Sequence, residues 1–280
     1  QLTEKVTDFG GTDAFMSEDE MKKTGADVLH IPTCIGSVVV TYNIPGNPKL
    51  KMTSDIIADI FLGKITDWSD KKIAAENKDV KLPKLKISVV TRSDGSGTTY
   101  VFTDYLSKAS SEFAEKVGKD KAPKWPVGLG GKGNPGVAGL VNQVPGSVGY
   151  VELIYAAQNK MMFADVKNKS GNYITPSLKS SSLAADVDLP ADTRVSITNT
   201  DAKDGYPIAS FTWLIFYKEQ NYNNRTLTQA ESLVNMLKWI IGDGQKIPET
   251  LDYGALPKAA VLASEKLIKS VTYNGKPIVK

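Results

Sequence analysis

The stretch that decides the fold is Thr91-Arg92-Ser93-Asp94-Gly95-Ser96-Gly97-Thr98-Thr99. A β-branched run at residues 87–90 precedes it, and apolar residues follow with the spacing of one helical face, at Val101, Phe102, Tyr105 and Leu106. This order predicts a strand, a glycine-containing turn and the first turn of a helix. The beginning of such a helix presents backbone N–H groups and the positive end of the helix dipole, and together they favour an anion.

The side chains of this stretch suit the same purpose. Arg92 offers a planar fork of donors that matches two oxygens of a tetrahedral oxyanion, and Asp94 is placed to hold that guanidinium in one orientation. Ser96 or Thr98 can cap the helix. Ordinary helix capping beside a surface ion pair explains the same residues, so the stretch alone leaves both interpretations open.

Composition narrows the class of protein. With 34 basic and 31 acidic residues among 280, the net charge is +3, and nothing indicates a nucleic-acid partner. The single cysteine, Cys34, and the single histidine, His30, exclude a disulfide within the chain and a His-rich or Cys-rich metal centre. We expect both to be packed structural residues. No apolar run approaches the roughly 20 residues that span a bilayer, so no stable membrane insertion is expected.

Strand-like and helix-like segments alternate along the chain, which predicts an α/β fold with a mainly parallel sheet. Strands are expected at residues 28–32, 36–43 and 206–217, and helices at 53–63, 228–239 and 258–269. In the helix at 228–239, the residues expected on the buried side are Leu233, Met236, Leu237 and Trp239. Residues 1–7 resemble the end of a helix, and residues 167–202 an irregular polar surface segment. For the glycine-rich residues 128–136 a structural chain reversal is the preferred interpretation, and a lining of the ligand cleft is the alternative.

Two long strands, around Val38 and around Leu214, bracket the middle of the chain. We interpret them as hinge strands between a domain built from both ends and a domain built from the middle. The expected boundaries are 1–34 with 211–280 for the first domain and 35–210 for the second.

Several ordered motifs resemble the phosphate-binding proteins of bacterial high-affinity phosphate ABC transporters, which are periplasmic binding proteins of the type II arrangement. Four of the motifs are Asp8-Phe9-Gly10-Gly11-Thr12-Asp13, Gly63-Lys64-Ile65-Thr66-Asp67-Trp68, Arg92-Ser93-Asp94-Gly95-Ser96-Gly97-Thr98 and Gly146-Ser147-Val148-Gly149-Tyr150-Val151-Glu152. The others are Asn43-Ile44-Pro45-Gly46, residues 125–134 and Leu251-Asp252-Tyr253. The resemblance runs essentially the whole length. It implies a two-lobed α/β fold, each lobe a mixed sheet flanked by helices, and joined by two hinge strands.

The resemblance also implies a set of ligand-binding residues. Arg92 would pair with phosphate oxygens, Asp94 would brace Arg92, and Ser96, Gly97 and Thr98 would donate hydrogen bonds at the helix N-terminus. Asp13 would accept the proton of hydrogen phosphate. A carboxylate facing an oxyanion is repulsive unless the anion carries a hydrogen, so sulfate would leave Asp13 without a donor, which costs about 1–3 kcal/mol or more. Without the resemblance, capping of the next helix would be the preferred role of Asp13.

The chain departs from the family at its beginning. In relatives, a first strand, a phosphate loop, a helix and a Ser-Gly-Gly turn precede the position of Gln1. We therefore expect an incomplete first lobe and an exposed sheet edge, which would be open to a domain-swapped dimer.

The function implied is that of an extracytoplasmic, non-enzymatic receptor without cofactor or metal, which captures inorganic phosphate between two lobes and delivers it to an ABC permease. Two alternatives stay open: a receptor for another oxyanion such as sulfate or molybdate, and a metal-dependent enzyme acting on phosphate esters. The chain lacks the Gly-x-x-x-x-Gly-Lys-[Ser/Thr] loop, but carboxylates alone could hold magnesium.

Overall fold

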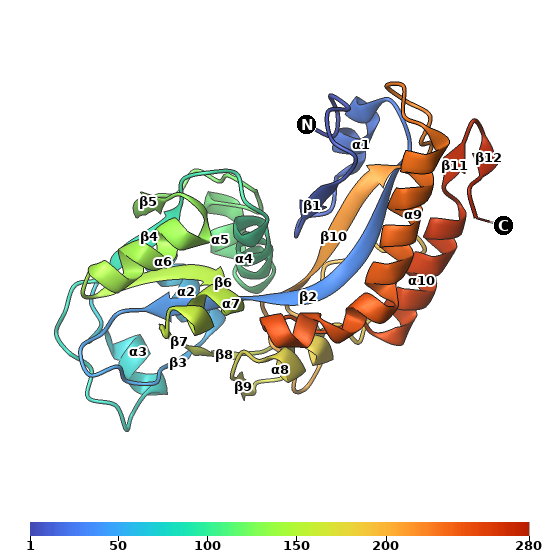
Figure 1. Ribbon diagram of the computed structural model, residues 1–280. Coiled ribbons are helices and arrows are strands. Elements are labelled where there is room, and N and C mark those ends of the chain that lie inside the picture. The colour runs from blue at the N-terminus through green and yellow to red at the C-terminus, as the bar shows by residue number, and fades with distance from the viewer. Residues whose placement is uncertain (280) are drawn as a thin grey trace. The chain divides into compact units, whose positions relative to one another are not determined.

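A computed structural model describes residues 1–279 (Figure 1). The chain divides into two compact units. Unit 1 contains Gln1–Ile35, Val187–Ser196 and Phe211–Lys280, and unit 2 contains Gly36–Asp186 and Ile197–Ser210. Two of the passages between the units fall inside the long strands β2 (Val28–Tyr42) and β10 (Ala209–Tyr217).

The sheet of unit 2 is built around strand β4 (Ser88–Arg92), which is parallel to both of its neighbours, β5 (Leu129–Gly131) and β6 (Ser147–Glu152). Strand β2 continues the sheet on the far side of β6 in antiparallel orientation and also pairs with β7 (Met162–Phe163). A separate small sheet contains β3 (Lys51–Met52), β8 (Asp165–Lys167) and β9 (Tyr173–Ile174).

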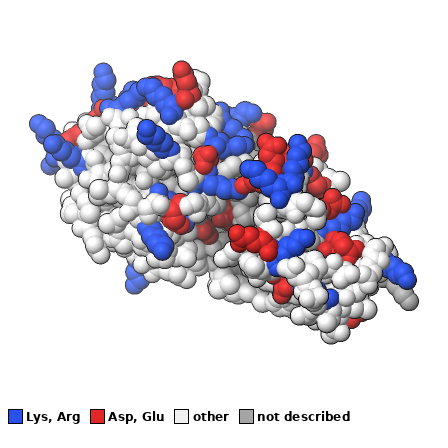
Figure 2. All heavy atoms as spheres, turned by 90° about the horizontal axis from the view of Figure 1, so that it is seen from above, with Lys and Arg blue, Asp and Glu red and all other residues white. Residues whose placement is uncertain are grey.

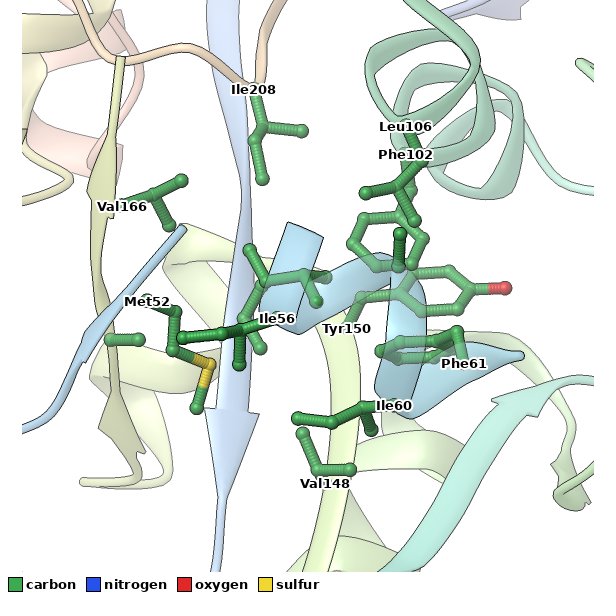
Figure 3. Packing of buried hydrophobic residues seen from close by; sticks show 14 of the residues in the cluster. Met52, Ile56, Ile60, Phe61, Phe102, Leu106, Val148, Tyr150, Val166 and Ile208 are labelled. Carbon is green, nitrogen blue, oxygen red and sulfur yellow. The ribbon is translucent and has the colours of Figure 1, made fainter. Parts of the chain in front are cut away.

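Helices cover both faces of this sheet because its strands alternate between two apolar clusters. Val38 and Val40 of β2 join the cluster that includes α2 (Ser54–Phe61) and α4 (Gly97–Ala109), whereas Val39 joins the cluster under α6 (Gly133–Gln143). Figure 3 shows part of the first cluster, where the Phe102 and Tyr150 rings stack with centroids 4.4 Å apart. The remaining helices of the unit are α3 (Lys71–Glu76), α5 (Ser111–Lys116), α7 (Leu153–Gln158) and α8 (Leu178–Ala184).

Unit 1 places β1 (Gly10–Thr12) antiparallel to β10, which neighbours β2. The helices α9 (Leu227–Ile241) and α10 (Lys258–Lys269) pack on these strands through Ile31, Phe216, Leu237 and Ile268. The smaller elements are α1 (Glu18–Thr24), the 3-10 turns Asp243–Lys246 and Pro248–Leu251, and the hairpin of β11 (Thr272–Tyr273) and β12 (Lys276–Pro277).

The structure confirms the α/β class and corrects several details. The prediction of a mainly parallel sheet was wrong: the strands form mixed sheets, because β1, β2 and β7 enter in antiparallel pairs. The two strands expected at 28–32 and 36–43 are one continuous strand, and residues 1–7 form turns rather than a helix. The segment 167–202 is partly interior, since Ser180 and Ser181 are buried.

Trp239 was also misplaced. It is 51% exposed, whereas Leu237 in the same helix is fully buried. The predicted domain boundaries stay a prediction. Residues 187–196 belong to unit 1, where Thr193 Oγ1 donates to the carbonyl of His30 and the Trp213 indole donates to the carbonyl of Thr193. Among residues 1–279, none of the helices has the length and apolar character needed to cross a bilayer.

Candidate anion-binding site

Three parallel strands of unit 2 end at the same edge of the sheet, and each leads into a helix. Strand β4 ends at Arg92 before α4, β5 ends at Gly131 before α6, and β6 ends at Glu152 before α7. In open α/β sheets, ligands bind outside the carboxyl ends of parallel strands. This edge is therefore the place in unit 2 to look for a ligand.

The turn between β4 and α4 forms the strand-turn-helix arrangement predicted from the sequence. Ser96 is the N-cap residue, and its Oγ accepts a hydrogen bond from the Thr99 N–H at 3.1 Å. Gly97 and Thr98 begin the helix. The N–H groups of a first turn have no acceptor within their own helix, so this turn is suited to donating to an anion.

The Arg92 guanidinium is held by Asp94 through two hydrogen bonds. Arg92 Nε donates to Asp94 Oδ1 at 2.8 Å and Arg92 Nη2 donates to Asp94 Oδ2 at 2.7 Å. Asp94 Oδ1 also accepts from the N–H of Gly133, the first residue of α6, at 3.0 Å. The hydrogen bond from Arg92 holds the pKa of Asp94 well below its usual range, and the pair raises the pKa of Arg92. Both groups therefore stay charged at neutral pH, and the guanidinium plane is fixed.

The Tyr150 hydroxyl of β6 makes hydrogen bonds to both ends of the same turn. Its hydroxyl accepts a hydrogen bond from the Arg92 N–H at 3.2 Å and shares another with Thr99 Oγ1 at 2.8 Å. Burial raises the pKa of Tyr150 to about 12, so the hydroxyl is neutral. The ring lies in the apolar cluster beside Phe61 and Phe102 (Figure 3), which joins the site rigidly to the core of unit 2.

Asn134 and Glu152 link the starts of the three helices. Asn134 Nδ2 donates to Glu152 Oε1 at 2.8 Å, and the Glu152 N–H donates to Asn134 Oδ1 at 3.2 Å. Thr98 Oγ1 donates to the same Glu152 Oε1 at 3.3 Å. Asn134 and Thr98 are buried, at 8% and 3% exposure. The three side chains thus connect α4, α6 and α7.

Asp13 belongs to unit 1, where it follows β1. The Thr212 hydroxyl of β10 donates to Asp13 Oδ1 at 2.6 Å, which holds the carboxylate in place. The structure thus brings together five of the six predicted site residues in unit 2, namely Arg92, Asp94, Ser96, Gly97 and Thr98.

Comparison with known proteins shows the family to which this chain belongs. A family model described as a PBP superfamily domain matches residues 1–243. The phosphate-binding protein PstS of Xylella fastidiosa (strain Temecula1) is 40% identical over 264 residues, covering 92% of this chain and 70% of that protein. PstS of Methanocaldococcus jannaschii is 40% identical over 276 residues, covering 90% and 71%. This chain belongs to the PstS family of phosphate-binding proteins.

The fold agrees with that of solved structures. A high affinity periplasmic phosphate-binding protein (PfluDING) with bound phosphate matches with a TM-score of 0.73 and 21% identity, covering 93% of this chain and 78% of that one. At that identity the likeness concerns the fold alone. It confirms for this PstS-family chain the two-lobed class expected from the sequence.

Sequence reasoning missed Tyr150, Asn134 and Glu152, which are hydrogen-bonded to residues of the candidate site in this PstS-family chain. Asn134 lies in the glycine-rich segment expected as a plain chain reversal, which instead supplies β5 and the start of α6. Glu152 lies 54 residues from Thr98 along the chain, and no local pattern joins them. One sequence signal could have indicated Tyr150 and Glu152 as site residues. Residues 147–152 form a strand that ends directly before a helix, as residues 88–92 do before α4.

Basic and acidic side chains can be compared on one face of the molecule. On the face shown in Figure 2, basic and acidic side chains are interspersed, in keeping with the net charge of +3. This face therefore offers no strongly basic surface that would attract an anion by charge alone.

Proposed function

We propose that this PstS-family chain is an extracytoplasmic receptor that captures inorganic phosphate and delivers it to an ABC permease. The observation that carries the proposal is that a chain 40% identical to two proteins named phosphate-binding protein PstS presents a fixed guanidinium beside a helix N-terminus. Binding and release, rather than turnover, would then be its activity.

In unit 2, the proposed phosphate contacts are the Arg92 guanidinium and the donors of the first turn of α4. The guanidinium uses Nε and Nη2 for Asp94, so its orientation is set before an anion arrives. A donor held in place in advance loses little side-chain entropy on binding. The Ser96 hydroxyl and the backbone N–H groups of Gly97 and Thr98 would donate to the remaining oxygens, with Asp94 acting only as a brace.

In unit 1, the proposed contact is Asp13, acting as the acceptor for a proton of phosphate. Its carboxylate is held by Thr212. Near neutral pH phosphate retains one or two protons, whereas sulfate retains none. The proposed Asp13 contact therefore favours phosphate over sulfate, because the carboxylate would face a bare sulfate oxygen where phosphate presents a hydroxyl donor.

The test is isothermal titration calorimetry with phosphate on the wild-type chain, Arg92→Ala and Lys132→Ala. Lys132 is a matched control, because it is an exposed cation at the start of α6 without a side-chain capping bond. We expect Arg92→Ala to weaken phosphate binding by about a hundredfold, since a charge-assisted hydrogen bond contributes about 1.5–3 kcal/mol. Lys132→Ala should change the affinity by less than about threefold. Comparable losses in both variants would contradict the role of Arg92.

The same purified chain can be used to test the two alternative functions. A competition series with sulfate and molybdate tests whether another oxyanion is preferred. A chromogenic phosphate ester, assayed with and without Mg²⁺, tests hydrolysis, and metal-dependent turnover would replace the receptor proposal by an enzyme.

A further inference from the structure

A closed ring of hydrogen bonds surrounds the start of α4. Arg92 binds Asp94, Asp94 accepts from the start of α6 at Gly133, and the neighbouring Asn134 binds Glu152. Glu152 accepts from Thr98, and the adjoining Thr99 binds the Tyr150 hydroxyl, which returns to the backbone of Arg92. The ring connects all three strand-to-helix turns at this edge of the sheet.

Glu152 occupies the junction where the three helices meet. A single oxygen, Oε1, accepts from Asn134 on α6 and from Thr98 on α4, while the Glu152 backbone N–H donates to Asn134 at the entrance to α7. A hydroxyl carries one proton to donate, and Thr98 Oγ1 donates its proton to Glu152 Oε1. The rotamer of Thr98 is thereby fixed.

Neither helix capping nor charge balance accounts for this glutamate. It stands at the N-cap position of α7 but makes no side-chain capping bond there. Its charge lies near the Arg92 guanidinium and contributes to the raised pKa of that group, after the larger effect of Asp94. An added negative charge beside an anion site disfavours the anion, so the benefit must come from the geometry that the carboxylate imposes.

We propose that Glu152 is a positioning residue of the anion site, which holds Thr98 and the first turn of α6 in register around Arg92. The inference rests on the proposed function, since it concerns how the same site is kept in shape. Glu152 does not touch the anion. It acts through Thr98 and Asn134, and its acceptor position matters more than its charge.

Two single substitutions separate position from charge. Glu152→Gln keeps an acceptor oxygen at the end of a side chain of the same length and removes the charge. Glu152→Asp keeps the charge and withdraws the oxygens by one methylene. Glu115→Ala is the matched control, because Glu115 is an exposed glutamate of α5 in the same unit.

Phosphate affinity of these variants is measured by calorimetry, together with urea denaturation of the phosphate-free chains. We expect Glu152→Asp to weaken binding by about tenfold or more, because buried donors lose their acceptor. Glu152→Gln should stay within about threefold of the wild-type chain. The reverse order, with Asp tolerated and Gln damaging, would overturn the proposal, as would wild-type affinity in both variants.

A double-mutant cycle supplies the second readout and does not depend on the stability of one variant. In a Thr98→Val background, the effect of Glu152→Asp should shrink to less than about half of its value in the wild-type background, since the partner hydroxyl is already absent. If the two substitutions change the free energy of phosphate binding additively, Glu152 does not act through Thr98. If the wild-type chain binds no phosphate, the proposed function fails; if Arg92→Ala behaves as expected but the Glu152 series does not, only this inference fails.

Discussion

Single residues of this chain serve more than one partner, and Asp94 is the clearest case. It holds the Arg92 guanidinium with both oxygens and also accepts from the N–H of Gly133 at the start of α6. The guanidinium is consequently aligned by a carboxylate that is itself held by another element. A local sequence pattern predicted the first contact, whereas the second needed the neighbouring parallel strand.

Asp13 carries a prediction about selectivity. In Asp13→Asn, the side chain can donate to a bare oxyanion, so the discrimination between phosphate and sulfate should narrow by about tenfold, which corresponds to about 1.4 kcal/mol. Calorimetry with both ions measures the ratio of the two dissociation constants. Asp27→Asn, at an exposed carboxylate of the same unit, is the control. An unchanged ratio in Asp13→Asn would contradict the proposed proton acceptor.

His30 carries a prediction about pH. Burial, assisted by Arg194, lowers the pKa of His30 from 6.5 to about 4, and its Nε2 accepts from the Met16 N–H at 3.0 Å. Between these two pH values the unfolded chain binds a proton that the native chain does not, so stability falls as the pH drops from about 6.5 to about 4. The loss from this group should reach about 3 kcal/mol, at 1.4 kcal/mol for each unit.

The chain has one histidine, so an NMR titration reports this group alone. The imidazole signal of the native chain should titrate near pH 4, and His30→Gln should remove the corresponding part of the pH dependence in urea denaturation. A native pKa near 6.5 would show that His30 is not buried as described.

At the scale of elements, the position of a residue around the helix axis decides whether its predicted burial in α9 is correct. The helix expected at 228–239 exists as α9, and Leu233 and Leu237 lie on its buried side as predicted. Trp239 does not, because the position two residues after Leu237 is turned about 200° around a helix axis with 3.6 residues per turn. The angle around the helix axis, and not hydrophobicity alone, decides which residues of the pattern are buried.

Substitutions in α9 test the face. Leu237→Ala should lower the free energy of unfolding by about 2–5 kcal/mol, because it leaves a cavity in the cluster with Ile31 and Phe216. Trp239→Ala should lower it by less than about 1 kcal/mol, since half of the side chain is already in water. Urea denaturation followed by circular dichroism measures both. Equal losses would place Trp239 in the core after all.

At the scale of the whole molecule, each unit has apolar clusters of its own. The cluster around Phe61, Phe102 and Tyr150 lies in unit 2, and that around Phe216, Leu237 and Ile268 lies in unit 1. Two of the passages between the units lie inside β2 and β10. A ligand that binds only the folded chain raises the free energy of unfolding, whichever unit it contacts.

Phosphate should raise the unfolding temperature. At a concentration one hundred times the dissociation constant, a ligand that binds only the folded state adds about 2.7 kcal/mol, which corresponds to roughly 4–6 °C for a chain of this size. Differential scanning fluorimetry checks the shift. The same phosphate concentration should leave Arg92→Ala nearly unshifted, and an equal shift in that variant would indicate binding elsewhere.

The sequence by itself determined what depends on neighbours along the chain: the strand-turn-helix at residues 88–109, the Ser96 cap, the Arg92–Asp94 pair, the α/β class and, through its motifs, the family. The tertiary structure decided which distant residues meet. Tyr150, Asn134 and Glu152 reach the start of α4 only because β4, β5 and β6 lie parallel and end at one edge of the sheet. Hydrogen bonds act over about 3 Å, and a separation of up to 54 residues is closed to that distance only by folding.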